Sequence, residues 1–340
     1  MKKSTIGGQG VLDGVMMRSP AKSALAVRAA SGELLTKTWP TKQHRAKIAR
    51  WPVIRGVIAF IDSLVGGMGV IMDAAKLSDS VADEEYQPNR FERFVAKKTG
   101  KSAMDVMMTF AVVLAIALAI GLFFILPTLI TGWLKGSIRS SLLINLIDGG
   151  VRIAIFMIYM LLIAQMKEIK DVFRYHGAEH KTVSCYEHDE ELTVENVQKY
   201  KTLHPRCGTS YILLVMIVTI LVYACLGWND NIWLRFGTRL LLLPVIAGLA
   251  YEVLKFGARG ERLIFRIVRW PGMQLQRLTT AQPRDDQVEA AILAFQMALD
   301  ELSEEELAAL KAQFDRRSPA QAAPAAEPEV EAPAAQEEHE

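Results

Sequence analysis

Residues 111–130, AVVLAIALAIGLFFILPTLI, decide the fold class of this chain, because they form a long run without a single charge. A helix rises about 1.5 Å per residue, so a run of this length reaches about 30 Å, the thickness of the hydrocarbon layer of a bilayer. The wider stretch 103–131 holds one charged residue, Asp105, near its start. The sequence therefore predicts a membrane-spanning helix over residues 103–131.

Three further stretches are apolar enough to cross a membrane, namely residues 142–166, 211–228 and 233–256. The first of them contains Asp148 and Arg152, which lie four positions apart and would neutralise each other on a helix. The chain of 340 residues is 51% hydrophobic, which is high for a soluble protein. We predict a mostly α, polytopic membrane protein with about four transmembrane helices over residues 102–256.

Lysine and arginine are unevenly distributed between the segments that join these spans. They are frequent in residues 1–101, in residues 167–206 and directly after residue 256, and sparse in the other two connections. Basic residues beside spans stay on the cytoplasmic side, so we expect both termini and segment 167–208 to be cytoplasmic. The expected partner is the lipid bilayer, with a second copy of the chain or another membrane protein as further candidates. A net charge of +2 gives no reason to expect a nucleic-acid partner.

Residues 1–50 read as a small β-rich cytosolic unit. Residues 24–28 and 33–36 are expected to pair as two strands across a turn at Ser31-Gly32, which predicts a hairpin. Residues 7–10, Gly-Gly-Gln-Gly, are expected to form a tight turn, since no Lys-Ser/Thr pair follows them as in a phosphate-binding loop. No apolar segment typical of a signal peptide is found here, so we expect none.

Residues 51–76 predict an interfacial or re-entrant helix, because glycines interrupt its apolar face. Asp62 within it is expected to pair with Arg55 or with a helix end. A charged linker over residues 77–101 is expected to follow.

Residues 257–316 are expected to hold amphipathic helices outside the bilayer. Residues 257–271 are basic and suit anionic lipid headgroups. Two capping boxes then predict where two helices begin. The box from Asp286 to Glu289 would start a helix over residues 287–299, and the box from Ser303 to Glu306 would start one over residues 304–314. Residues 317–340 are rich in Ala, Pro and Glu, which predicts a disordered acidic tail.

Four of the six histidines gather in residues 173–207, where His176 to His180 form an H-x-x-E-H pattern. On a helix these positions share one face, so both imidazoles and the Glu179 carboxylate would point to one place. Two imidazoles can hold a metal that lowers the pKa of water from 15.7 toward about 7, and a carboxylate can take the proton. The same pattern marks the inverzincin metallopeptidases, in which the glutamate is the base. We therefore assign His176 and His180 as ligands and Glu179 as the catalytic residue.

The third metal ligand has three candidates. His204 and Cys207 flank a Pro-containing turn that ends at Gly208, and such a turn can aim both side chains at one ion. Glu252 is an ionisable residue within the last span, which makes it a functional candidate. Its alternative partners are Lys255 and Arg259.

The other histidines and cysteines are expected to have ordinary roles. His188 lies in an acidic run and is expected to be a solvated loop residue. His44 lies among lysines and arginines and His339 lies in the tail, so neither is a candidate. In the reducing cytosol Cys185 would be a thiol available as a ligand, whereas Cys225 lies within a span and is expected to be inert.

The chain resembles the YqhQ-like family of bacterial membrane proteins, a domain of unknown function described as predicted metal-dependent enzymes. The resemblance covers about residues 7–294 and rests on four motifs: GGQGVLDGVMMR at 7–18, RYHGAEHKT at 174–182, HPRCGTS at 204–210 and PGMQLQ at 271–276. The chain departs from the family pattern at Asp13 and Gln282, where the family has glutamate. The resemblance implies a metal-dependent enzyme in the bacterial inner (cytoplasmic) membrane.

Two functions remain open at this point. The first is a metal-dependent hydrolase with zinc, or another divalent metal, at the cytosolic face. The second is a non-enzymatic scaffold or assembly factor, in which His176, His180, His204 and Cys207 would close a structural zinc site. Glu179 discriminates between them, because a closed structural site needs no carboxylate base.

Overall fold

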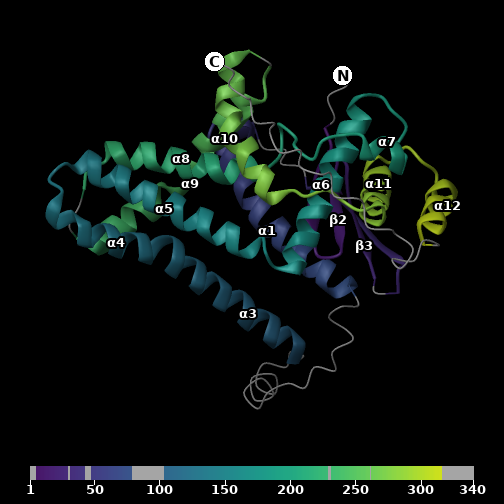
Figure 1. Ribbon diagram of the computed structural model, residues 1–340, viewed down its shortest axis with the longest axis horizontal. Helices are drawn as coiled ribbons and strands as arrows, with labels where there is room; N and C mark the ends of the chain where they lie inside the picture. The colour runs from purple at the N-terminus through teal and green to yellow at the C-terminus, as the bar shows by residue number, and fades with distance from the viewer. Residues whose placement is uncertain are drawn as a thin grey trace, which may run out of the picture.

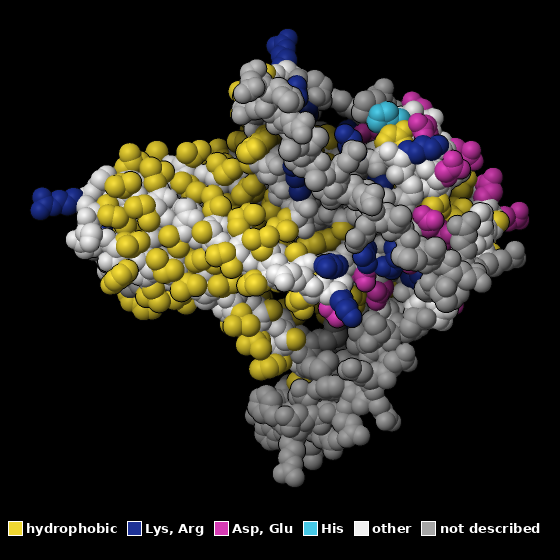
Figure 2. All heavy atoms as spheres, in the orientation of Figure 1, with side chains coloured by type: hydrophobic (Ala, Val, Ile, Leu, Met, Phe, Trp, Pro, Cys, Tyr) yellow, Lys and Arg dark blue, Asp and Glu magenta, His cyan; other side chains and the backbone are white. Residues whose placement is uncertain are grey.

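The computed structural model describes residues 5–29, 31–42, 47–78, 103–228, 231–260 and 262–315. Within them a bundle of apolar helices extends to one side of a β-sheet that helices cover on both faces (Figure 1). Hydrophobic side chains cover the bundle in Figure 2, and charged side chains gather at the opposite end of the molecule. Residues 79–101 of the expected linker, and the expected tail, lie outside the described residues.

The N-terminal β-unit is a four-stranded antiparallel meander in the order β1-β2-β3-β4. Its strands are β1 (Gly7–Val11), β2 (Gly14–Arg18), β3 (Lys22–Arg28) and β4 (Leu34–Pro40). The predicted hairpin is confirmed, with Ala26 opposite Thr36. The predicted turn at residues 7–10 is wrong, because these residues form β1. The turn follows at Asp13, whose φ of 53° lies in the left-handed region that aspartate tolerates.

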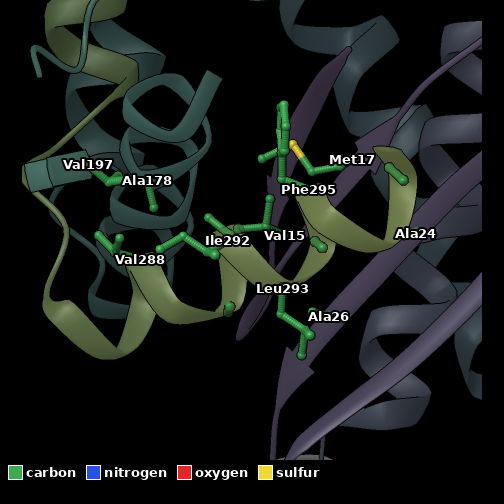
Figure 3. Close-up of a cluster of buried hydrophobic side chains, with 14 of the residues drawn as sticks. Val15, Met17, Ala24, Ala26, Ala178, Val197, Val288, Ile292, Leu293 and Phe295 are labelled. Carbon is green, nitrogen blue, oxygen red and sulfur yellow. The ribbon is translucent and has the colours of Figure 1, made fainter. Parts of the chain in front are cut away.

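The sheet packs against helices on both faces, because β2 and β3 carry consecutive apolar side chains, and successive side chains of a strand point to opposite faces. On one face Val15, Met17 and Ala24 pack against α6 (Lys167–Glu187) and α11 (Asp285–Leu299), as Figure 3 shows. On the other face Leu25 and Val27 pack against Val70 and Ala74 of α1 (Ile54–Leu77). This double cover fixes the helix that carries the H-x-x-E-H pattern against the sheet.

The apolar bundle confirms a mostly α, polytopic architecture. Its elements are α3 (Ala103–Ile120), the π-helical turn η3 (Gly121–Ile125), α4 (Leu126–Leu134), the short η4 (Lys135–Ser137), α5 (Ser141–Ile163), α8 (Thr209–Cys225) and α9 (Ile232–Gly257). Among the described residues, four helices are long and apolar enough to cross a membrane: Ile54–Leu77, Thr109–Ser137, Ser141–Ile163 and Trp233–Gly257.

Three of these four helices correspond to expected spans, and the fourth, α1, was not expected to be one. The expected span over residues 211–228 is the shorter helix α8, which begins after the turn at Gly208 and ends before Gly227, whose φ is 72°. Its 17 residues reach about 26 Å, at the lower limit for a span. α1 has the length and composition of a span instead.

The packing of α1 bears on its relation to the membrane. Its last turns are buried against the sheet, and Ser78 directly after it donates a hydrogen bond of 2.6 Å to Asp13. Its first turn packs on α9, where a Cβ atom on Gly56 would lie 2.8 Å from the Cα atom of Gly248. α1 therefore lies across the boundary between the bundle and the sheet (Figure 1). Its interfacial placement stays a prediction, which this packing supports.

The remaining helices lie near the sheet or beside the bundle. They are the short η1 (Lys47–Arg50), α7 (Val194–Gln198), α10 (Leu263–Thr279) and α12 (Glu304–Asp315). The second capping box is confirmed, since the Glu306 amide donates to the Ser303 hydroxyl and the Glu306 carboxylate accepts from the Ser303 amide. The first is wrong: α11 begins at Asp285, and the Gln287 side chain accepts from the Arg284 amide at 3.0 Å. Glu289 is buried inside the helix instead.

Candidate metal centre

The H-x-x-E-H pattern lies on the buried side of α6, against the edge strand β1. The strand comes so close that a Cβ atom on Gly10 would lie 2.6 Å from the backbone nitrogen of His176. A Cβ atom on Gly8 would likewise lie 3.0 Å from Cγ of Glu179. The two glycines of β1 therefore allow the backbone of the strand to form a wall of the site. The sequence reasoning missed this role, although the spacing of glycines at every second position was a signal for one close-packed strand face.

Both imidazoles of the pattern are oriented by backbone carbonyls. Nδ1 of His176 lies 2.9 Å from the carbonyl oxygen of Thr279, and Nδ1 of His180 is hydrogen-bonded to the carbonyl oxygen of Thr202. A carbonyl only accepts, so each Nδ1 must carry the proton and donate. Each Nε2 then has its lone pair available, which is the tautomer that a metal ligand requires.

The thiol of Cys207 completes a group of three convergent ligand atoms. Its Sγ lies 3.2 Å from Nε2 of His176, and the ligand atoms of His176, His180 and Cys207 all lie within 4.8 Å of one another. In a tetrahedral zinc site with bonds of about 2.0–2.3 Å, neighbouring ligand atoms are about 3.3–3.8 Å apart. The three ligand atoms therefore need to move only slightly toward one another to bind one ion.

A side-chain amide holds the turn that carries Cys207. The Gln276 side chain on α10 accepts from the His204 amide and donates to the His204 carbonyl, both at 2.9 Å. The same amide nitrogen lies 3.0 Å from the Ser210 hydroxyl. Gln276 belongs to the PGMQLQ motif, and His204 belongs to the HPRCGTS motif, so this contact joins the two motifs at the site. Their separation in sequence gives no sign of the contact.

The chemistry of the donor set fits a metal ion. Nε2 of His180 is buried and makes no hydrogen bond to any of the described residues. A buried acceptor without a partner is destabilising, and a metal ion would satisfy it. Burial also lowers the pKa of His180, so that the imidazole stays neutral and ready to bind a cation.

Glu179 lies beside the three ligand atoms rather than among them. Its Oε2 atom is 3.4 Å from Nε2 of His180 and 4.0 Å from Nε2 of His176. The side chain is buried, which raises the pKa of its carboxyl, while electrostatic interaction with the nearby His176 and His204 and the hydrogen bond from the Gly8 amide oppose that rise. A carboxyl in such surroundings can exchange a proton with a neighbouring water.

His204 is close to the group but faces other partners. Its ring lies 5.6 Å from that of His180, while its Nε2 is 3.5 Å from both Glu187 and Arg206. Arg206 and Glu187 form an ion pair, and Glu187 is almost fully buried. Burial lowers the pKa of His204. Glu187 is therefore a member of the site that the sequence reasoning did not assign.

The structure does not bring Glu252 to this group. Both of its carboxylate oxygens are bound by Arg55 on α1, with Nε at 2.6 Å from Oε1, and the Val53 amide donates to it at 3.3 Å. The pair joins α9 to the start of α1. The hydrogen-bonded partner of Glu252 is thus Arg55 rather than Lys255 or Arg259. Of the two alternatives expected for Asp62, pairing with Arg55 is not found, because the Arg55 guanidinium binds Glu252.

The remaining histidines and cysteines lie away from the three ligand atoms or outside the described residues. Nδ1 of His188 donates to the Ser184 carbonyl at 2.7 Å, and His188 is exposed, as expected, but at the end of α6. Cys185 is buried in the core beside the sheet and does not belong to the group of convergent ligand atoms. Cys225, expected to pack inside a span, is exposed at the end of α8. His44 and His339 lie outside the described residues.

Two cavities meet at the candidate site. One of about 410 Å³ has a mixed lining of polar and apolar side chains, and its charged members are Glu179, Arg206, Asp62 and Arg18. The other, of about 690 Å³, reaches His176 from the bundle side. Apolar and aromatic side chains of α1, α5, α8 and α9 dominate its lining, among them Phe60, Leu64, Met160, Ile212, Val215 and Leu254. Gly8, Gln9, Ser63 and Cys207 line both cavities.

Comparisons with known proteins show the family to which the chain is related. The family described as "Protein of unknown function (DUF1385)" matches residues 51–301. The "Uncharacterized protein YqhQ" of Bacillus subtilis (strain 168) is 32% identical over 311 residues, which cover 88% of this chain and 94% of that protein. No solved structure matches the chain.

Proposed function

The chain belongs to the DUF1385 family, and we propose that it is a metal-dependent hydrolase embedded in the bacterial inner membrane. The observation that carries the proposal is the convergence of His176, His180 and Cys207 within 4.8 Å, beside the buried carboxylate of Glu179. The metal is zinc in this proposal, because two imidazoles and a thiolate are the donor set that zinc prefers.

Each residue of the site has a distinct part. His176, His180 and Cys207 would hold the ion, and the carbonyls of Thr279 and Thr202 keep both imidazoles in the binding tautomer. A bound zinc ion supplies Lewis acidity and lowers the pKa of a coordinated water to about 7. Glu179 would accept the proton of that water and pass it to the leaving group.

The position of His204 favours a catalytic site over the structural alternative. A closed structural site needs four protein ligands, whereas a catalytic site has three and keeps one position for water. Nε2 of His204 lies at 3.5 Å from Glu187 and from Arg206, outside the group of three convergent ligand atoms. The side chain that lies next to the three ligands is the carboxylate of Glu179, as hydrolysis requires.

The two cavities support an amphiphilic substrate. The smaller cavity is lined by the charged side chains of Glu179, Asp62 and two arginines, while the larger cavity reaches His176 and is lined mainly by apolar side chains of the bundle. Both volumes fall within the range of about 300–1,000 Å³ that small-molecule sites occupy. We infer a substrate with a polar group at the metal and an apolar part directed toward the bilayer.

The orientation in the membrane is part of the same proposal. The sheet, α6 and α11 lie at one end of the bundle, and the α4–α5 and α8–α9 connections lie at the other (Figure 1). The basic residues of segments 1–101 and 167–206 favour the cytoplasm for the first end. The site would then act at the cytosolic face.

Zinc analysis of the detergent-purified full chain tests the metal assignment. We expect about one equivalent of zinc per chain, because one group of three ligands is present in the described residues. His176→Ala and His180→Ala should purify nearly free of metal, since losing a ligand weakens binding far more than the ~10–100-fold effect of an outer-shell change. If either variant keeps a full equivalent, the assignment of that residue is wrong.

Cobalt substitution tests the thiolate ligand. The Co²⁺-loaded protein should show a thiolate-to-metal charge-transfer band that Cys207→Ser removes. Cys225→Ser is the matched control, because Cys225 is an exposed thiol at the far end of α8. Loss of the band in the control alone would place the metal elsewhere.

Glu179→Gln separates the hydrolase from the scaffold. The variant keeps the volume of the side chain and should retain its zinc, yet lose ~10²–10⁴ in rate because no base remains. It should fail to complement a strain that lacks its own copy of the gene. Full complementation by a zinc-loaded Glu179→Gln protein would reject the hydrolase and leave the scaffold.

A further inference from the structure

A second cluster of charged side chains lies on α5 and α9. It is in the first half of each helix, and both helices begin at the end of the bundle remote from the sheet (Figure 1). It consists of Asp148 and Arg152 on α5 and Arg235 and Arg239 on α9. Arg239 follows the start of α9 by seven residues, so it lies about 10 Å along the helix from that end. This depth is that of the boundary between lipid headgroups and hydrocarbon.

Asp148 is the carboxylate on which this cluster is centred. It accepts hydrogen bonds from Nε of Arg152 at 3.1 Å and from the hydroxyl of Thr131 at 2.9 Å. Nη2 of Arg239 lies 2.8 Å from it. The Asp148–Arg152 pair was expected from their spacing, whereas the contact with Arg239 joins α5 to α9 and depends on the fold.

The arginines are held in place by contacts beyond Asp148. Nη1 of Arg152 donates to the Phe123 carbonyl at 2.7 Å. The guanidinium of Arg235 lies 4.2 Å from the centre of the Trp228 ring, and that of Arg239 lies 5.0 Å from the centre of the Tyr223 ring. Such contacts fix the direction of a guanidinium without neutralising its charge.

Positive charge exceeds negative charge around Asp148. Arg152 and Arg239 share this one carboxylate, so the three side chains together carry a formal charge of +1. Arg239 is 6% exposed, and its Nη1 makes no hydrogen bond to any described residue. Buried charge without a counter-charge is costly at this depth, so the cluster calls for an anion.

A cavity of about 300 Å³ adjoins the three arginines. Its other lining residues are Ile120, Phe124, Ile125, Thr128, Trp233 and Phe236. Several of these are apolar side chains on the outer surface of the bundle, with Ile125 51% and Trp233 81% exposed. The cavity is thus positive where it meets the arginines and apolar where it meets the surface that faces lipid.

We propose that this cavity binds the phosphate group of an anionic phospholipid in the leaflet opposite the sheet. The arginines would donate to the phosphate oxygens, including through the unpartnered Nη1 of Arg239, since a guanidinium fork matches phosphate geometry. The lipid chains would lie against Ile120, Ile125 and Phe236. A lipid is favoured over free phosphate because the lining is apolar outside the three arginines and one threonine.

Native mass spectrometry of the full chain in detergent tests this site. Dioleoyl phosphatidylglycerol should bind at least tenfold more tightly than dioleoyl phosphatidylcholine, and inorganic phosphate should not compete at matched concentration. Arg235→Gln should weaken phosphatidylglycerol binding at least tenfold while the Asp148 pairs with Arg152 and Arg239 remain. Arg139→Gln is the matched control, because Arg139 is an exposed arginine at the same end of the bundle.

A second variant keeps the proposal testable if Arg235→Gln fails to fold. Phe236→Trp narrows the cavity without a change of charge and should also weaken phosphatidylglycerol binding. Equal binding by the wild type and both variants would overturn the site. Competition by inorganic phosphate, with no preference for the anionic lipid, would overturn the lipid assignment. Neither result depends on zinc or on hydrolysis, since the cluster lies at the other end of the bundle from His176.

Discussion

Gly10 on β1 and His176 on α6 are in direct backbone contact: a Cβ atom on Gly10 would lie 2.6 Å from the His176 nitrogen and 2.6 Å from the Val172 carbonyl oxygen. No side chain fits between strand and helix at this point. The glycine-rich N-terminal motif therefore serves the candidate metal centre by its lack of side chains. It lets a strand from the first residues of the chain support a helix far away in sequence.

Gly10→Ala should disturb the metal centre through this contact. The added methyl group must push β1 away from α6, at a cost of about 1–3 kcal/mol in the free energy of unfolding. We expect a lower melting temperature in detergent and a loss of bound zinc. Gly7→Ala is the control, because a Cβ atom there meets nothing within 4 Å. Equal zinc content and stability in both variants would show that the contact between β1 and α6 tolerates a side chain at residue 10.

Gln276→Leu should loosen the turn that carries Cys207. The side chain bonds both backbone groups of His204, and leucine of similar size can bond neither. We expect zinc affinity to fall by about 10–100-fold, as for other groups that orient metal ligands. Competition with a zinc chelator measures this change. Gln274→Leu makes the same exchange on the same helix and should leave the affinity unaltered.

Arg28 and Glu289 form a buried ion pair between β3 and α11, with 3.1 Å between Nη2 and Oε2 and side chains 4% and 0% exposed. Arg28→Met should destabilise the protein by about 3–5 kcal/mol, because it removes the guanidinium that pairs with the buried charge of Glu289. Adding Glu289→Leu should restore part of this loss. Chemical unfolding in detergent would measure both values.

Lys22→Met on the same strand is the control for that experiment. Lys22 pairs with Asp300 at 2.7 Å, but Asp300 is 63% exposed. Exposed pairs contribute about 0–1 kcal/mol, so little change is expected. A loss as large as that of Arg28→Met would mean that burial does not set the strength of these pairs.

Reporter fusions should establish the orientation of the bundle. Fusions at Gly136 and Gly227 should report the far side of the membrane, and fusions after Gln198 and Gly260 should report the cytoplasm. The reason is the excess of lysine and arginine in residues 1–101 and 167–206. A far-side signal after Gln198 would reverse the topology and place the His–Cys group outside the cytoplasm.

The features that could be predicted from the sequence are those that depend on neighbouring residues. The uncharged run at residues 111–130 lies within a helix long enough to span a bilayer, because length and hydropathy alone determine that capacity. The four-residue spacing of His176 and His180 places them together on any helix, and α6 is one. The Ser303–Glu306 cap is also local, and it is confirmed.

Tertiary structure decided the features that depend on residues far apart in the chain. The glycines at residues 7–10 satisfy a turn or a close-packed strand equally well, and only the approach of α6 distinguishes the two. Glu252 and Cys207 were equal candidates for the third ligand by residue type. The packing of α1 on α9 places Glu252 in an ion pair with Arg55. The turn held by Gln276 brings Sγ of Cys207 to 3.2 Å from Nε2 of His176. Spacing along the chain determines which side chains share a helix face, but only the packing of elements determines which faces meet.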